Sequence, residues 1–226
     1  MALFQDFQPF GLGFLNTIRM TLLAVALALA LGVVFGVMST AQNGVLRGIS
    51  RVYVELIQNT PLLIQIFFLY NGLPYLGIVL SVFPIGVLGV GIYHGAYIAE
   101  VVKTGILSTP SGQFEAGRSQ GFTHVQIMRY IVIPQAVRVI LPPLTNQIVN
   151  LIKNTSIVAM IAGGDLMYQA NSWASSTLNY GPAYAVTGVL YFILCFPLAR
   201  LAQRMENRIK SSRGGRPADR KAGEAA

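Results

Sequence analysis

A stretch of 44 residues without a single charge, Leu56 to Ala99, limits the folds open to this chain more than any other feature. A helix needs about 20 apolar residues to cross the ~30 Å hydrocarbon core of a membrane, so this stretch is too long for one crossing. The segment Asn71-Gly72-Leu73-Pro74, followed by Pro84, is typical of a break near its middle. We therefore predict two membrane spans joined by a short outer connection.

Three other apolar segments have the length of a membrane span. The first has a core of leucine, alanine and valine from Leu22 to Val37, the fourth runs from about Val139 to Ala162, and the fifth runs from Ala183 to Ala199. Only 11% of the residues are charged, compared with about a quarter in soluble domains. The sequence therefore predicts an all-α membrane protein with five transmembrane helices.

The basic residues indicate the orientation of these spans, because Lys and Arg are enriched in short cytoplasmic loops. With the N-terminus outside, the predicted cytoplasmic side receives every loop Lys and Arg and the eight from Arg200 onward, and the other side receives only Arg19. We therefore predict a multi-pass membrane protein whose C-terminus is cytoplasmic. The net charge of +8 belongs to this topology, whereas nucleic-acid binding requires a basic face on a folded soluble domain.

The two ends of the chain differ from the predicted transmembrane domain, residues 14–210. Residues 1–13 alternate aromatic and polar side chains, which is typical of an amphipathic segment in the membrane interface, and a frayed terminus is the alternative. Residues 211–226 are small, charged and rich in Gly and Pro, which predicts a disordered cytoplasmic tail.

A polar stretch of helical character, Thr109 to Pro134, lies between the third and fourth predicted spans. Thr109 and Pro110 suit the N-cap and the first position of a helix. Gly121 suits the left-handed conformation in which such a helix commonly ends. Thr123 with Gln126 three residues later has the pattern of a capping box for a second helix. We predict a helix, a turn and a helix on the cytoplasmic side.

The first of these helices contains Glu115-Ala116-Gly117, which places one carboxylate beside two small residues. Taken alone, this triplet fits an ordinary surface helix as well as a docking surface for another protein. Its spacing to Gly121 and to Ile131-Val132-Ile133-Pro134 resembles the EAA loop of ABC-transporter permeases, with Gly117 in place of the second alanine and Ile133 in place of leucine. The resemblance implies a coupling helix that contacts an ATPase through Gln113, Glu115, Ala116, Gly117, Arg118 and Gly121.

Three further segments are similar to the polar amino-acid uptake permeases of bacteria: Asn59 to Gln65, Ala96 to Glu100, and Leu151 to Ser156. This resemblance implies a type I ABC importer permease of the bacterial plasma membrane that works by alternating access. It implies a second permease subunit, two ABC ATPase subunits and an extracytoplasmic substrate-binding protein as partners. The N-T-P form at residues 59–61 with K-N-T at 153–155 is similar to glutamate-type permeases, which favours glutamate or aspartate as substrate.

ATP chemistry belongs to a partner, because the sequence has no G-x-x-x-x-G-K-[ST] phosphate-binding loop of its own. We predict no enzyme activity and no cofactor. His94 and His124 lie thirty residues apart and without a ligand set, so both are interpreted as structural, and no metal site is predicted. Two alternatives stay open: a secondary transporter or channel, which needs no ATPase, and a membrane assembly subunit that transports nothing.

An internal repeat of the form L-I-x-N-T points to a substrate site, since it places Asn and Thr 10 to 15 residues into the second and fourth spans. Polar groups at that depth are costly and usually face a protein interior or a water-filled path. The alternative is that they only hydrogen-bond between packed spans. Lys153 at this depth requires an anionic partner. The predicted substrate-binding residues are Gln58, Asn59, Thr60, Lys153, Asn154, Thr155 and Ser156.

Overall fold

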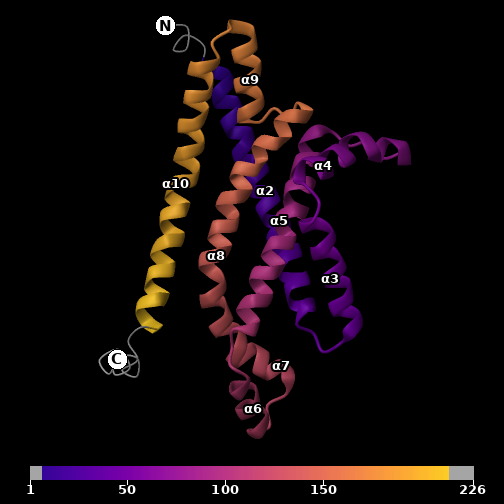
Figure 1. Cartoon of the computed structure of the whole chain (residues 1–226), viewed down its shortest axis with the longest axis vertical. Coiled ribbons are helices and arrows are strands. Elements are labelled where there is room, and N and C mark those ends of the chain that lie inside the picture. Colours follow the sequence, from indigo (N-terminus) through magenta and orange to yellow (C-terminus); the bar gives the residue numbers. More distant parts are fainter. Residues whose placement is uncertain (1–6, 214–226) are drawn as a thin grey trace, which may run out of the picture.

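The protein is described by a computed structural model that covers residues 7–213, and within this range the regular structure is entirely helical (Figure 1). Long helices run side by side, and two short helices, α6 and α7, lie beyond one end of them. The helices are α2 (Gln8–Ser39), α3 (Gly44–Gln58), α4 (Leu62–Phe67), α5 (Val82–Leu107), α6 (Ser111–Ser119), α7 (His124–Ile127), α8 (Ile133–Asn154), α9 (Leu166–Thr177) and α10 (Tyr180–Arg213). Turns of π-helix extend α4 over Phe68–Gly72 and join α7 to α8 over Met128–Val132, and 3₁₀ turns cover Leu73–Leu76 and Thr155–Ile161.

The predicted five spans are confirmed, with the second one bent. Four helical segments are long and apolar enough to cross a membrane: Gln8–Ser39, Val82–Leu107, His124–Ile161 and Tyr180–Ile209. The pair Gly44–Gln58 and Leu62–Leu76, which bends by 98° between its halves, makes the fifth crossing when it is counted as one broken span. Figure 1 shows α4 projecting sideways from the bundle at this bend. The break predicted at Asn71-Gly72-Leu73-Pro74 occurs a few residues later, because these four residues still belong to the π-helical and 3₁₀ turns. The chain leaves the helix at Gly77, which has φ +77°, and α5 begins at Val82.

Helix α5 is the central helix. Of its most apolar 18-residue segment, 56% is buried inside the protein, compared with 11% for the corresponding segment of α10. It runs parallel to α2: Gly86 faces Met20 near one end, and Gly36 faces Val102 near the other. A Cβ atom on Gly36 would lie 2.6 Å from Val102 Cβ and 2.9 Å from the Ala99 carbonyl oxygen. Small residues at this contact let the two backbones approach closely, as is usual where helices pack in lipid.

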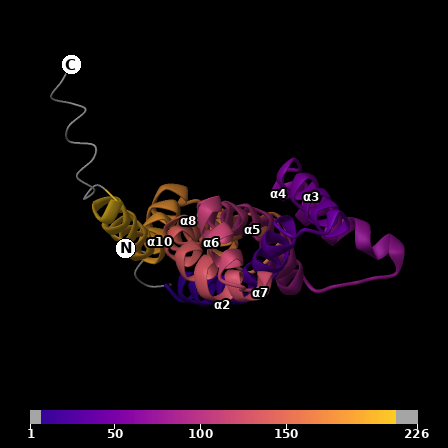
Figure 2. The same cartoon turned by 90° about the horizontal axis from the view of Figure 1, so that it is seen from below.

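Large apolar side chains remain exposed on the outer helices, for example Leu22 at 65% and Phe192 at 60%. Exposed apolar surface of this extent is expected where helices face hydrocarbon rather than water. α10 lies at one edge of the bundle, and α3 with α4 lies at the other (Figure 2). This arrangement leaves α5 and α8 between the two edges of the bundle.

The two termini differ from their predicted forms within the described residues. The N-terminal segment does not lie apart from the first span, because α2 is continuous from Gln8, and Phe10 is fully buried with its ring edge-on to Trp173 at 5.6 Å. At the other end, α10 continues to Arg213, three residues into the range predicted to be disordered. Residues 1–6 and 214–226 of these two predictions lie outside the described residues.

The first residues of α9 hold a buried carboxylate and a hydrogen bond to α2. Asp165 is the N-cap of α9, and its Oδ2 accepts a hydrogen bond from the Met167 N–H at 3.0 Å. The next residue, Leu166, donates its N–H to the Thr17 hydroxyl oxygen at 3.0 Å. The Asp165 side chain is fully buried, and its Oδ1 has no hydrogen-bond partner among residues 7–213. Burial therefore raises the pKa of Asp165 to about 6, since the charged form loses its hydration.

Asp165→Asn is expected to stabilise the protein at neutral pH. A folded-state pKa above the unfolded value of about 3.9 means that stability is greatest below pH 4 and falls as the pH rises through about 6. Asparagine keeps the capping oxygen and has no charge, so the variant should gain roughly 2 to 3 kcal/mol at pH 7.5. Thermal unfolding in detergent at pH 4.5 and 7.5 checks this. A wild-type melting temperature that rises with pH over this interval would contradict it.

Candidate functional site

The polar stretch between α5 and α8 forms the predicted helix, turn and helix, with one difference at its start. α6 begins at Ser111, and Pro110 is its N-cap with φ −57° and ψ 139°, so the predicted cap at Thr109 is wrong by one residue. Thr109 is instead buried with its hydroxyl unpaired. A proline N-cap is compatible with the helix because it precedes the first helical residue and needs no N–H there.

The turn after α6 is confirmed in detail. Gly121 has φ +79°, a left-handed conformation that glycine adopts without strain. The N–H of Phe122 donates to the Gly117 carbonyl at 3.0 Å, which closes the helix end in the manner of a Schellman motif. The capping box of α7 is present, with the Gln126 N–H donating to the Thr123 hydroxyl and the Thr123 N–H donating to Gln126 Oε1.

The candidate coupling residues separate into an exposed set and one buried member. Glu115, Ala116 and Arg118 are exposed at the end of the molecule where α6 projects (Figure 1). Gly117 is buried, and a Cβ atom there would meet Ile127 Cγ1 at 2.9 Å and Ile131 Cδ1 at 3.2 Å. The small residue thus allows α7 to pack beneath α6, and it does not widen the exposed surface as its place in the triplet predicted.

The remaining coupling residues connect this surface to the bundle. Gln113 is exposed on α6, and its Oε1 accepts a hydrogen bond from Gln135 Nε2 on α8 at 2.6 Å. Gly121 is exposed, and no atom lies within 4 Å of the position of a Cβ there. The α6–α7 unit is therefore tied to the start of α8 by one side-chain bond and by the packing of Ile127 and Ile131.

The first copy of the L-I-x-N-T repeat forms the bend between α3 and α4. Asn59 Nδ2 donates to the Glu55 carbonyl at 2.7 Å, and the Thr60 hydroxyl donates to the Leu56 carbonyl at 2.8 Å. Gln65 Nε2 donates to the carbonyls of Ile57 and Thr60, at 2.9 and 3.0 Å. These side chains give the carbonyls around the break hydrogen-bond donors, which the low dielectric of a membrane favours.

The second copy of the repeat lines a polar cavity of about 350 Å³ between α5 and α8. Asn154 Nδ2 lies 3.0 Å from His94 Nε2, and the hydroxyls of Tyr93 and Tyr97 lie 3.1 Å apart. Lys153 is exposed, and no ion pair of Lys153 is found among the described residues. The cavity is lined by Tyr93, His94, Tyr97, Gln147, Asn150, Lys153 and Asn154.

Thr155 and Ser156 do not line this cavity. Both belong to the 3₁₀ turn that follows α8, where the Thr155 hydroxyl donates to the Ile152 carbonyl and the Ser156 hydroxyl donates to the Lys153 carbonyl, each at 2.7 Å. Thr155 is fully buried. Both hydroxyls therefore donate to carbonyls of the last turn of α8 and are not directed to the cavity.

The two copies of the repeat reach the same level of α5 from different sides. Gln58 Nε2 donates to the Ala96 carbonyl at 3.2 Å, two residues along from His94, which contacts Asn154. Thr60 lines a second, apolar cavity with Ile64 and Phe68, and this cavity shares no residue with the one at Lys153. Within one chain, the predicted substrate residues thus do not form a single site.

Several residues of the polar cavity were not among the predicted ones. His94, interpreted as structural, contacts Asn154 directly, and Tyr93 and Tyr97 lie one turn apart on α5. Gln147, Asn150 and Asn154 lie three and four residues apart, which places them on one face of a helix. This row of polar residues on an otherwise apolar span could have identified Gln147 and Asn150 as lining residues from the sequence. The L-I-x-N-T repeat includes only Asn154 of the three.

Known proteins of one class share both sequence and fold with this chain. Residues 13–211 match the family described as "Binding-protein-dependent transport system inner membrane component". The probable glutamine ABC transporter permease protein GlnM of Bacillus subtilis (strain 168) is 41% identical over 93% of this chain and 97% of its own length. The L-cystine transport system permease protein TcyB of the same organism is 33% identical over 91% and 88%.

Solved structures agree with these relatives. The "crystal structure of an amino acid ABC transporter with histidines" has a TM-score of 0.85 and 34% identity, and covers 92% of this chain and 97% of its own. An inward-facing conformation of the MetNI methionine ABC transporter has a TM-score of 0.68 at 17% identity, over 85% and 94%, which supports the fold alone.

Proposed function

Because the chain belongs to the family of binding-protein-dependent transport system inner membrane components and is an amino-acid ABC importer permease, we propose that it moves a polar amino acid past the cavity between α5 and α8. The observation that carries this proposal is the polar cavity itself, which places a cation, three amides and two phenols between central helices. Such groups in a membrane span are costly unless they face a path or a ligand.

The lining of the cavity supports a neutral polar substrate. An amino acid brings a carboxylate and an ammonium, and Lys153 supplies a cation for the carboxylate. No carboxylate lies among the lining residues, so the ammonium is left to amide oxygens and to the faces of Tyr93 and Tyr97. An amide side chain finds both donors and acceptors at Gln147 and Asn150. Glutamine is therefore the first candidate, in line with the names of the relatives.

Glutamate or aspartate is the second candidate, and it is favoured by the same lysine. In that case Lys153 pairs with the side-chain carboxylate of the substrate rather than with its α-carboxylate. Competition between glutamine and glutamate for uptake separates these two assignments.

We propose that ATPase subunits bind the exposed face of α6, with Glu115 as its orienting charge and Ala116 as the point of close approach. Closure of the two ATPases then moves α6 and α7 together, and the Gln113–Gln135 bond with the packing of Ile127 carries the motion into α8. Because α8 also carries Lys153 and Asn154, the motion reaches the cavity directly. A second permease subunit, identical or related, completes the pathway opposite this one, and an extracytoplasmic binding protein delivers the substrate.

The test is reconstitution of the permease with its ATPase partner and binding protein in lipid vesicles. Glutamine uptake that requires ATP, together with ATPase activity stimulated by the loaded binding protein, is the expected result. Uptake without ATP would identify a secondary transporter or channel instead, and the absence of uptake with intact assembly would identify an assembly subunit.

The proposed orientation has the α6 end in the cytoplasm and the N-terminus outside. Single cysteines at Ser119 in α6 and at Ser172 in α9, both exposed positions, test this after Cys195 is replaced by serine. The cysteine at 172 is expected to react with a membrane-impermeant maleimide in intact cells, and the cysteine at 119 only after permeabilisation. The reverse pattern overturns the orientation.

The two asparagines of the repeat are expected to differ in their effect on transport. Asn154→Ala removes the partner of His94 in the cavity and should lower uptake about fivefold, the equivalent of one neutral hydrogen bond. Asn59→Ala removes a bond to its own helix and should change uptake by less than about twofold. Uptake rates at equal expression check this, with thermal unfolding as the control for folding. A larger effect at Asn59 would place the substrate at the bend instead.

A further inference from the structure

A second polar cavity, of about 420 Å³, lies between α3 and α5 at the end of the bundle nearest α6, and the proposed transport path does not use it. Its walls carry three cations, Arg47, Arg51 and Lys103, and two carboxylates, Glu55 and Glu100. Its volume is in the range of small-molecule sites. Charged groups of both signs that converge on one cavity are the arrangement expected for a ligand that itself carries both signs.

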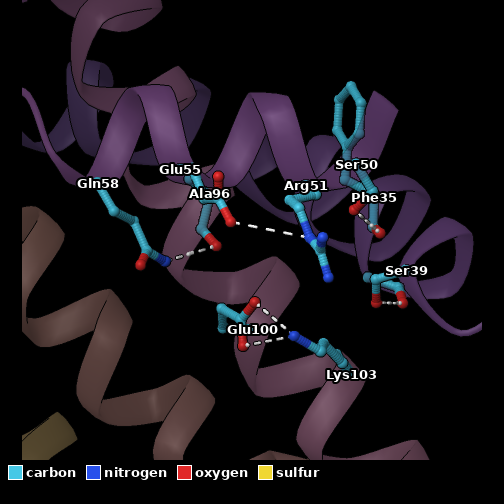
Figure 3. Close-up of polar contacts among 10 residues, drawn as sticks. Phe35, Ser39, Ser50, Arg51, Glu55, Gln58, Ala96, Glu100 and Lys103 are labelled. Carbon is cyan, nitrogen blue, oxygen red and sulfur yellow. Dashed lines mark hydrogen bonds and ion pairs between the residues drawn. The ribbon is translucent and has the colours of Figure 1, made fainter. Parts of the chain in front are cut away.

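The charges are sorted along the cavity. α3 follows α2 through a tight turn and so runs antiparallel to it, and α5 runs parallel to α2. Glu55 on α3 and Glu100 on α5 therefore lie toward the bend at residue 59, and Arg51 and Lys103 lie toward α6. Figure 3 shows the two carboxylates on one side of the space between the helices and the two cations on the other. At the carboxylate end, the hydrogen bond from Gln58 to the Ala96 carbonyl joins the two walls.

The existing ion pairs lie along each wall and not across the cavity. Arg51 Nε lies 3.8 Å from Glu55 Oε1 on α3, and Lys103 Nζ lies 3.0 Å from Glu100 Oε1 on α5. The side chains of the first pair are 78% and 67% exposed. Exposed pairs of this kind contribute little, so exchanging these partners for those of a ligand costs little. Arg47 is less available, because its Nη1 donates to the carbonyls of Ala41 and Gln42.

We propose that this cavity binds a free zwitterionic amino acid, with its α-carboxylate between Arg51 and Lys103 and its ammonium between Glu55 and Glu100. A ligand with one charge satisfies only one end of the cavity, and a phosphate group meets the two carboxylates. The assignment rests on the proposed function, since the imported amino acid is the zwitterion available at the α6 end. The cavity is then a second, product-side site, separate from the one at Lys153.

The test uses a cysteine at Ser39, a residue of the cavity wall, in a Cys195→Ser background. The purified permease–ATPase complex, without binding protein, is labelled with a maleimide in the presence of glutamine, glutarate, putrescine or inorganic phosphate. Glutamine at ten times its Kd should slow labelling about tenfold, because an occupied site is protected. Glutarate, putrescine and phosphate at the same concentration should leave the rate unchanged. Equal protection by phosphate or glutarate overturns the proposal in favour of a plain anion site.

Variants of the cavity separate binding from indirect effects. Arg51→Gln and Glu100→Gln should each raise the glutamine concentration needed for protection at least tenfold, about the loss of one charge-assisted bond. Arg19→Gln removes an exposed cation in the N-terminal half of α2, far along that helix from Ser39, and should leave the glutamine concentration needed for protection unchanged. Protection that survives both cavity variants overturns the assignment of these residues.

Lys153→Met tests whether the two cavities are independent sites. It also separates a failure of the second-site proposal from a failure of the proposed function. Protection of the cysteine at position 39 should persist in this variant, since Lys153 does not line the cavity between α3 and α5. If wild-type vesicles take up glutamine while labelling is unaffected by it, the second site is wrong and the proposed function stands. If uptake and protection are both absent, both are wrong.

Discussion

We expect that replacing Gly117 by leucine abolishes ATP-driven uptake while the protein still inserts in the membrane. The new side chain meets Ile127 and Ile131, whose nearest atoms lie 2.9 and 3.2 Å from its Cβ position, so α6 must move away from α7. Overpacking of this kind costs about 1 to 3 kcal/mol, which is tolerable for a whole bundle. In the proposed coupling role, α6 has to be held in one orientation to transmit motion, so the same displacement is expected to stop transport. Uptake and ATPase rates of the reconstituted complex measure the effect.

Gly112→Leu is the matched control for this substitution, because it lies in the same helix and nothing lies within 4 Å of its Cβ position. The control is expected to keep more than half of wild-type uptake, an effect of about 0.4 kcal/mol or less. Wild-type uptake in Gly117→Leu at equal expression would contradict the coupling role of the α6–α7 unit. Glu115→Ala in the same assay shows whether the exposed carboxylate contributes as well.

We expect Lys153→Met to lower uptake at least tenfold, because a substrate in the proposed site would lose Lys153, the one Lys or Arg among the residues that line the cavity between α5 and α8. A hydrogen bond to a charged group contributes about 1.5 to 3 kcal/mol, which corresponds to roughly 10- to 150-fold. If Lys153 binds the α-carboxylate, uptake of glutamine and glutamate falls equally. If Lys153 binds a side-chain carboxylate, glutamate uptake falls much more. Initial rates for both amino acids, in vesicles with matched protein content, decide between these assignments.

Ser156→Ala is the control for the lysine substitution. Ser156 lies in the 3₁₀ turn directly after α8 and does not line the cavity, and its hydroxyl is already bonded to the Lys153 carbonyl, so uptake should change by less than about twofold. Lys153→Met with normal uptake of every amino acid tested would remove the cavity from the transport path. The α6–α7 coupling role would be unaffected by that result.

Much of the architecture follows from local features of the sequence. The number of spans depends on hydropathy over about 20 neighbouring residues, and it was predicted correctly from the uncharged stretch and the other apolar segments. The start of the second span was predicted wrongly, because its first half, Gly44–Gln58, is an amphipathic helix that carries charges. The turn between α6 and α7 depends on Gly121 and on the box formed by Thr123 and Gln126, whose bonds lie within a few residues. Such interactions are the same wherever the segment lies, so they can be recognised before the fold is known.

The candidate site depends on which face each helix turns inward, and that is decided by contacts between distant segments. Asn59 and Asn154 stand in the same pattern, yet one bonds its own helix and the other bonds His94, sixty residues away. Gly117 belongs to a triplet associated with docking, yet it is buried under Ile127. The sequence by itself determined the number of spans, the turn and the polar residues. Only the tertiary structure decided which of those residues share a cavity, because a helix rotates freely about its axis until its neighbours pack against it.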